Sequence, residues 1–153
     1  MISKKVISKA LMVLFAVMAV SMPQVAANDS TERMNEQIVR NYLQTLPSLD
    51  MPSITKYLAD DVVHTGLMPG MPPIKGREEF NTYWANMIKG VERQTIEIRR
   101  VKAMGSTVLA ERIDTVWGDG EELTFHLTTL FVVKEGKIVE FREYMMPGGG
   151  MGM

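Results

Sequence analysis

Three charged residues could perform acid–base chemistry, and two of them lie on one expected strand. Arg112 and Asp114 stand two apart in Ser106–Trp117, a run of strand-forming residues bounded by glycines. Side chains two apart in a strand share a face, and this face is otherwise apolar through Val108, Ala110 and Val116. A buried charge must be paired, and a guanidinium pairs well with a carboxylate. The pattern indicates a buried Arg–Asp pair; a surface ion pair on the sheet is the alternative.

Glu143 supplies a second carboxylate. It stands on the last expected strand, on the face that carries apolar side chains. With the apolar faces of the strands turned inward, Glu143 joins Arg112 and Asp114 in one pocket. The apolar walls of this pocket are expected to be Phe125, Leu127, Phe141 and Met145, with Trp84 from a covering helix.

This arrangement of charges separates an acid from a base. Two carboxylates bridged by one guanidinium titrate as a coupled unit. Burial raises the pKa of a carboxyl group and a neighbouring cation lowers it, so one acid can hold a proton while the other acts as a base. Such a division of roles suits general acid–base chemistry on an uncharged substrate.

The elements that must position these residues are four long strands and three helices. From residue 92 the apolar period is two, with short glycine-bearing loops between the runs, which is typical of antiparallel hairpins in series. The strands are expected at 92–102, 106–117, 123–133 and 137–146. Upstream, helices are expected from the N-cap candidates 28–30 to Pro47, at 52–58 and at 77–89, with a short strand at 62–65 and a loop over 66–76. The fold class is therefore α+β, with three N-terminal helices packed on a curved, mostly antiparallel sheet that forms a cone-shaped pocket.

Residues 1–27 have the pattern of a cleavable secretory signal peptide. A basic region with Lys4, Lys5 and Lys9 precedes the apolar run Ala10–Val20, and small residues follow at 25–27. Eleven apolar residues are fewer than the about 20 that a membrane-spanning helix needs. We therefore expect an exported protein, periplasmic or secreted, with a single domain over 28–146 and a flexible Gly/Met tail over 147–153.

The charge balance limits the classes of partner. Residues 1–27 hold three of the 17 basic residues and none of the 18 acidic ones, so the remainder has 14 basic and 18 acidic residues and a formal net charge of −4. This excess of acid argues against nucleic acid or an anionic membrane surface as the partner. The chain has no cysteine, so no disulfide supports the fold. Its two histidines are far apart and lack carboxylates at ligand spacing, so we expect no metal site and no cofactor.

Three short segments resemble the limonene-1,2-epoxide hydrolase family: AERID at 110–114, EGKI at 135–138 and FREY at 141–144. That family belongs to the nuclear-transport-factor-like superfamily of cone-shaped α+β domains, and the resemblance covers residues 32–146. It implies an acid–Arg–acid site that opens an epoxide in one step. Arg112 would hold both acids, Asp114 would protonate the epoxide oxygen, and Glu143 would activate water. It also implies a homodimer through the exposed sheet face, with a patch of Leu109, Ile113 and Trp117.

Two regions depart from the family's pattern. Glu143 stands where the family has an Asp, which extends the carboxylate by one methylene. His64 and Gly66 stand where the family holds its water with a Tyr and an Asn. We therefore expect His64 to position water or to act as an acid or base near the cavity mouth; a structural histidine at the end of a strand is the alternative.

Three functions are compatible with these residues. The first is an epoxide hydrolase acting on a small apolar molecule. The second is an enzyme like the polyketide cyclases or ketosteroid isomerases, in which Asp114 or His64 abstracts a proton next to a carbonyl group. The third is a non-enzymatic module that binds a small molecule or a partner, since a fold does not by itself define a function.

Overall fold

The computed structural model describes residues 22–66 and 70–146. The basic region and apolar run of the expected signal peptide, and the expected tail at 147–153, lie outside the described residues. The chain divides into two compact units, Met1–Thr31 and Glu32–Met153, and the sheet belongs to the second. Within the described residues, no helix is both long enough and apolar enough to cross a membrane.

Helices occupy three of the expected places. Helix α2 covers Met22–Thr45, the one-turn helix η1 covers Leu46–Ser48, α3 covers Met51–Thr55 and α4 covers Arg77–Met87. The predicted start of the first helix is wrong, because residues 28–30 lie inside α2 and not at its N-terminus. At α3 the local signals are present, since the Asp50 side chain accepts a hydrogen bond from the Ser53 backbone N–H and a proline follows Met51.

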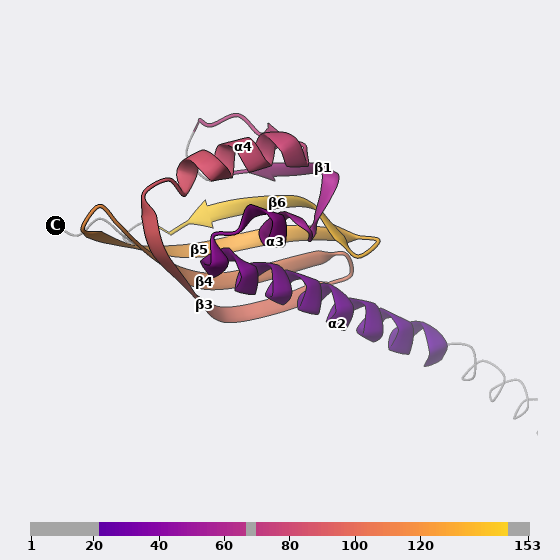
Figure 1. Cartoon of the computed structure of the whole chain (residues 1–153). Helices are drawn as coiled ribbons and strands as arrows, with labels where there is room; N and C mark the ends of the chain where they lie inside the picture. The colour runs from indigo at the N-terminus through magenta and orange to yellow at the C-terminus, as the bar shows by residue number, and fades with distance from the viewer. Residues whose placement is uncertain (1–21, 67–69, 147–153) are drawn as a thin grey trace, which may run out of the picture. The chain divides into compact units, whose positions relative to one another are not determined.

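One six-stranded sheet forms the rest of the second unit (Figure 1). Its strands are β1 Leu58–Thr65, β2 Ile74–Lys75, β3 Val91–Met104, β4 Thr107–Gly118, β5 Glu121–Lys134 and β6 Lys137–Met145. Their order is β2-β1-β6-β5-β4-β3, and every pairing is antiparallel except that of β1 with β6. The α+β class and the antiparallel meander at 91–145 are confirmed.

The prediction that residues 66–76 form only a loop is wrong, because the segment contains a short strand. Ile74 and Lys75 form β2, which pairs with β1, and the Gly76 backbone N–H donates to the Val62 carbonyl oxygen at 2.7 Å. The reason is that Ile74 is buried in the apolar core, so this short edge strand is fixed by packing rather than by a local strand pattern.

The strict alternation of inward-facing and outward-facing side chains also fails at the start of β6. The register between β5 and β6 shifts between Val132 and Val133, where a bulge inserts an extra residue. As a result Ile138 and Phe141, three residues apart on β6, are both buried. Beyond the bulge the predicted faces hold, and Glu143 points inward with Phe141.

The apolar core lies between α2 and one half of the inner sheet face. Val39, Tyr42 and Leu43 of α2 are buried against the sheet, and the Tyr42 ring meets the Phe131 ring edge-on at 5.9 Å between centroids. Polar contacts fix the helix to the β3–β4 hairpin: the Asn35 amide donates to the Gly105 carbonyl oxygen at 2.9 Å. The helix thereby closes this half of the inner face.

On the outer face, the patch expected for a dimer is half-buried within the single chain. The Arg93 guanidinium lies 3.6 Å from the centroid of the Trp117 ring, and the Trp117 indole N–H donates to Glu122 at 2.8 Å. Charged side chains of the same sheet thus cover part of the patch, and association of two copies stays a prediction.

Candidate active site

The structure brings together the four residues predicted to carry the chemistry. Arg112 and Asp114 come from the middle strand β4, Glu143 from β6 and His64 from β1. All four are buried, with none more than 6% exposed. The alternative of a surface ion pair is therefore wrong for Arg112 and Asp114.

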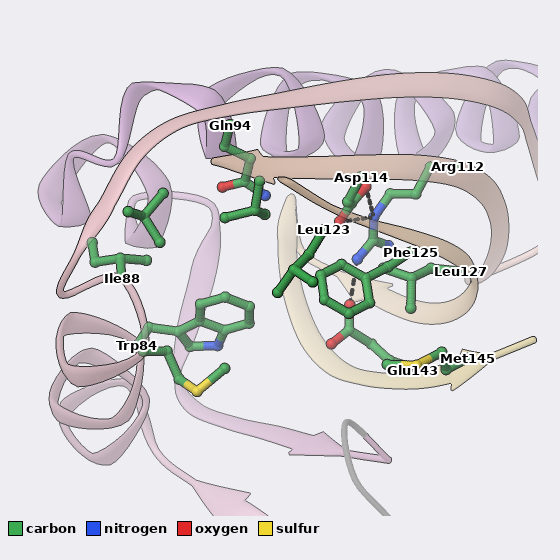
Figure 2. A pocket seen from close by; sticks show the side chains of 13 residues that line it. Trp84, Ile88, Gln94, Arg112, Asp114, Leu123, Phe125, Leu127, Glu143 and Met145 are labelled. Carbon is green, nitrogen blue, oxygen red and sulfur yellow. Dashed lines mark hydrogen bonds and ion pairs between the residues drawn. The ribbon is translucent and has the colours of Figure 1, made fainter. Parts of the chain in front are cut away.

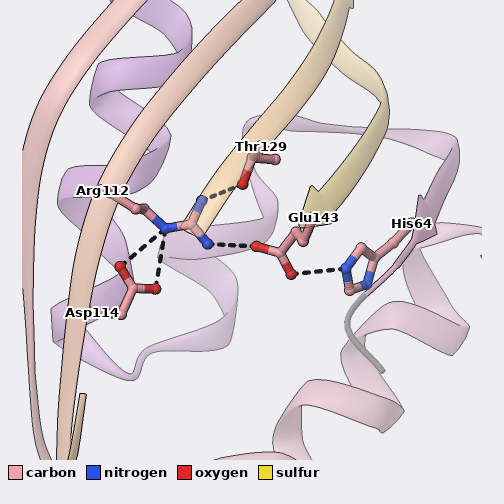
Figure 3. Close-up of polar contacts among 5 residues, drawn as sticks. All are labelled: His64, Arg112, Asp114, Thr129 and Glu143. Carbon is pink, nitrogen blue, oxygen red and sulfur yellow. Dashed lines mark hydrogen bonds and ion pairs between the residues drawn. The ribbon is translucent and has the colours of Figure 1, made fainter. Parts of the chain in front are cut away.

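A single guanidinium connects the two carboxylates (Figure 3). Arg112 Nε donates to both carboxylate oxygens of Asp114, at 3.0 and 3.1 Å, and Nη2 donates to Glu143 Oε1. The third nitrogen, Nη1, donates to the hydroxyl oxygen of Thr129. Every nitrogen of the guanidinium therefore has a partner, which fixes the orientation of both acids relative to each other.

His64 contacts Glu143 on the oxygen that does not face Arg112, and it does not lie at the mouth of the cavity. Its Nε2 is 3.0 Å from Glu143 Oε2, and its ring stacks on Phe141 at 4.3 Å between centroids. This follows from the parallel pairing of β1 with β6, which sets His64 opposite Phe141. The predicted position near the mouth is wrong, because His64 is 2% exposed and is not among the residues that line the cavity.

The environment separates the pKa values of the two acids. Burial raises the pKa of Asp114 to about 6, although the Arg112 charge opposes the shift. For Glu143 burial alone would raise the pKa, but the Arg112 charge and the His64 hydrogen bond outweigh it and lower the pKa to about 2. At neutral pH Glu143 is therefore ionised and accepts from His64, so His64 Nε2 carries the proton in this bond. Asp114 is therefore the acid that gains and loses its proton near neutral pH.

A cavity of about 270 Å³ opens beside these groups (Figure 2). Arg112, Asp114 and Glu143 contribute to its wall. Its apolar lining consists of Trp84, Met87, Ile88, Val91, Val116, Leu123, Phe125, Leu127 and Met145. Four of the five predicted wall residues are among them. Phe141 is not, because it lies in the core beneath His64.

Two contributors, Thr129 and Gln94, were not predicted from the sequence, and neither was the close approach of Gly66 to Glu143. Thr129, fully buried, accepts from Arg112, and its signal was a hydroxyl on an otherwise apolar inward face. Gln94 lines the cavity from β3, where it alternates with Ile96 on the inward face. Gly66 has φ +95°, and a Cβ there would collide with the Glu143 carbonyl oxygen. The position of the family's Asn therefore cannot carry a side chain in this backbone.

The described residues contain no group of three or more His, Asp or Glu side chains arranged to hold a metal ion. What the site offers is a proton donor and a proton acceptor on one wall of an apolar cavity.

A curved sheet closed by helices, with an acid–Arg–acid site on its inner face, defines an NTF2-like pocket domain. The chain belongs to the SnoaL-like domain family, whose model matches residues 39–141. It is 28% identical over 106 residues to the epoxide hydrolase EphG of Mycobacterium tuberculosis, an alignment that covers 69% of each protein.

Solved structures agree with this assignment. An LEH-like epoxide hydrolase of M. tuberculosis superposes with a TM-score of 0.66 and 25% identity, over 75% of this chain and 84% of the other. An NTF2-like protein of Anabaena variabilis superposes with a TM-score of 0.69 and 21% identity, over 80% and 93% of the two chains. The resemblance found in the sequence is therefore confirmed, and the chain is related to epoxide hydrolases of this fold.

Proposed function

We propose that this protein is a cofactor-independent hydrolase that opens a small epoxide by direct attack of water. The observation that carries the proposal is the Asp114–Arg112–Glu143 assembly on the wall of an apolar cavity. The two acids have pKa values of about 6 and about 2, so one is a proton donor while the other is an ionised acceptor. Hydrolysis of an epoxide by water needs both groups at once.

The reaction transfers two protons in one step. Glu143 takes a proton from a water molecule as the water oxygen forms a bond to an epoxide carbon. The carbon–oxygen bond of the ring breaks, and Asp114 gives its proton to the departing oxygen, which yields a vicinal diol. The buried site holds one guanidinium charge and one carboxylate charge before and after the step, so no additional charge is desolvated.

An apolar substrate promotes the required protonation state. At neutral pH the free site holds Asp114 mostly ionised, since its pKa is about 6. A substrate that fills the cavity removes water from Asp114, and desolvation raises a carboxyl pKa further. Substrate binding therefore favours the proton on the acid that must donate it.

The geometry favours Glu143 as a base over Glu143 as a nucleophile. One carboxylate oxygen accepts from Arg112 and the other is held by His64. Each oxygen keeps a second lone pair that can accept from a water molecule. A carboxylate that is held by a donor at each of its two oxygens is, however, poorly oriented to form an ester with a substrate carbon. His64 acts here as a positioning residue for the base.

The cavity limits the substrate to a small molecule. Its volume of about 270 Å³ is slightly below the range of about 300–1,000 Å³ that is usual for ligand pockets. Its walls are apolar apart from the acid–Arg–acid assembly and Gln94. An uncharged epoxide with a short hydrocarbon body matches these walls.

The test is turnover of a panel of terpene, styrene and aliphatic epoxides, with diols detected by mass spectrometry. Wild-type protein is compared with Asp114→Asn, which removes the proton donor, and with Asp61→Asn, the same change at an exposed position of β1. We expect diol from wild type and from Asp61→Asn, and a loss of about 10²–10⁴-fold in Asp114→Asn. Absence of diol from every epoxide, or an unchanged rate in Asp114→Asn, would refute the proposal.

A second candidate is proton abstraction next to a carbonyl group, with Asp114 as the base. The raised pKa of about 6 favours it, because a base near the working pH is efficient. Deuterium exchange from solvent into a ketone substrate, with epoxides left unchanged, would select this reaction over hydrolysis.

We also propose export, on the pattern of residues 1–27. The measurement is the N-terminal sequence of the protein recovered from its native cells. A chain beginning at Asn28 supports cleavage after Ala27, and an intact N-terminus contradicts it.

A further inference from the structure

Among the described residues that line the cavity, Gln94 carries the one side-chain amide; the only other polar group outside the acid–Arg–acid assembly is the indole N–H of Trp84, which is buried. It stands on the inward face of β3, while its neighbours Arg93 and Thr95 are exposed on the other face. Among residues 22–66 and 70–146, none forms a hydrogen bond with its side-chain amide. The Gln94 side chain is only partly buried, and its amide is not one of the buried polar groups that lack a partner, so the amide is open to a ligand that enters the cavity.

The sheet register places Gln94 next to the acid and away from the base. Gln94 pairs with Val116 across β3 and β4, and Asp114 is two residues from Val116 on the same face. Such diagonal neighbours have Cα atoms about 7–8 Å apart, within reach of a long side chain. In Figure 2, Gln94 and Ile88 lie well apart from Glu143. The polar groups thus follow one diagonal of the sheet: acceptor Glu143, bridge Arg112, donor Asp114, and then Gln94.

We infer that Gln94 binds an oxygen of the substrate beside the epoxide ring, and that the substrate is an epoxide with a hydroxyl or carbonyl group on the adjacent carbon. The inference rests on the proposed function, because Asp114 fixes the place of the epoxide oxygen. When the epoxide oxygen is bound to Asp114, the Gln94 amide lies on the side of the ring that faces away from Glu143. It is therefore nearest to the substituent on the ring carbon at that side. The amide offers both a donor and an acceptor, which matches a hydroxyl group, and its N–H also matches a carbonyl oxygen.

The test compares two substrates that differ only in that oxygen: trans-2,3-epoxyhexan-1-ol and trans-2,3-epoxyhexane. Wild type is compared with Gln94→Met, which keeps an unbranched side chain without polar hydrogen-bonding groups. The control is Gln37→Met, the same change at an exposed position of α2. We expect wild type and Gln37→Met to prefer the alcohol by about tenfold in kcat/KM, the effect of one neutral hydrogen bond, and Gln94→Met to lose that preference.

The outcomes separate this inference from the proposed function. Equal kcat/KM for the two substrates in wild type, or an unchanged preference in Gln94→Met, would overturn the role of Gln94 while hydrolysis stands. If wild type opens neither epoxide, calorimetric binding of hexane-1,2,3-triol and hexane-2,3-diol decides. Tighter binding of the triol that disappears in Gln94→Met supports the role of Gln94 although hydrolysis fails. Equal binding of the two overturns it.

Discussion

The inner face of the sheet has two halves that are built on the same strands and do different things. Toward the β3–β4 turn, β4 and β5 present Val108, Ala110 and Phe131, all fully buried under α2. A few residues further along β4, the same face presents Arg112 and Asp114 to a cavity. One half is closed by a helix and is apolar, and the other is open and holds three buried charges.

The comparison shows where this fold gains stability and where it gives some up. Apolar burial stabilises the first half at about 25 cal/mol per Å². The second half contains buried charges, which are at best neutral for stability compared with apolar residues of similar size. The buried charges of this half are therefore explained by the proposed proton transfer and not by a gain in stability. Substitutions in the two halves should therefore have different signatures.

The largest effect is expected for Arg112→Met, which leaves two carboxylates buried without their cation. Breaking a buried ion pair costs about 3–5 kcal/mol, and activity should fall at least a thousandfold because neither acid is held. The measurements are thermal unfolding and diol formation. Arg142→Met is the control, since Arg142 pairs with Glu140 at the surface and such pairs contribute little. Equal losses of stability and activity in the two variants would contradict the claim that the buried ion pairs of the site matter more than a surface ion pair.

Phe131→Ala tests the apolar half. The ring is fully buried and packs on Tyr42 and Phe141, so its removal should cost about 3–5 kcal/mol in the free energy of unfolding. The pH dependence of kcat/KM in the folded fraction should not change, because no titrating group loses a partner. A shifted pH profile would show that the two halves are not independent.

His64 should affect the base without carrying the reaction. In His64→Leu we expect kcat to fall about tenfold to a hundredfold, because Glu143 loses the donor on Oε2 and its orientation. The pKa of Glu143 should also rise from about 2, so the acidic limb of the pH profile moves to higher pH. His64→Gln, whose amide can donate, should recover part of both losses. A purely structural role would lower stability and leave that limb in place.

The pH dependence separates the two acids in the wild type. Asp114 must be protonated to donate, so kcat/KM should fall about tenfold per pH unit above its pKa of about 6. Stability has the same direction: the folded state holds this proton more tightly than the unfolded chain, so the free energy of unfolding falls as pH rises from about 4 to about 6. Asp114→Asn should abolish this contribution, and an unchanged pH dependence in that variant would contradict the assignment.

The smallest effect is expected for Thr129→Val, which keeps the shape and removes the acceptor of Arg112 Nη1. An unsatisfied buried donor costs about 1–3 kcal/mol, and activity should fall only several-fold because both carboxylates keep their contacts. Thr128→Val, on the opposite face of β5, is the matched control. A thousandfold loss in Thr129→Val would mean that Thr129 belongs to the catalytic assembly.

The sequence was informative wherever the signal was local. Glycine-bearing turns defined the hairpins, and the period of two placed Arg112 and Asp114 on the inward face of β4. Two acids and one guanidinium on facing strands then predicted the assembly, because strand pairing by tight turns brings them together.

The remaining features depend on contacts between distant segments. The parallel pairing of β1 with β6 joins residues about 80 apart in the chain. It places His64 in contact with Glu143 and not at the cavity mouth, where the sequence analysis had expected it. A bulge opposite Val132 and Val133 turned Ile138 inward, and no residue type announces it. Gln94 is polar on a strand with many polar residues, so only the register with β4 shows that it faces the cavity.

The central claim is that Glu143 activates water and forms no bond to the substrate. The most direct measurement is a single turnover of an epoxide in ¹⁸O-water, with enzyme in excess, followed by mass spectrometry of the diol and of the protein. Glu97→Gln, a surface change, is the control for Glu143→Gln. Our account predicts one ¹⁸O atom in the diol of the first turnover, none in the protein, and loss of the diol in Glu143→Gln. Unlabelled diol with ¹⁸O in the Glu143 carboxylate would reveal an ester intermediate and contradict it.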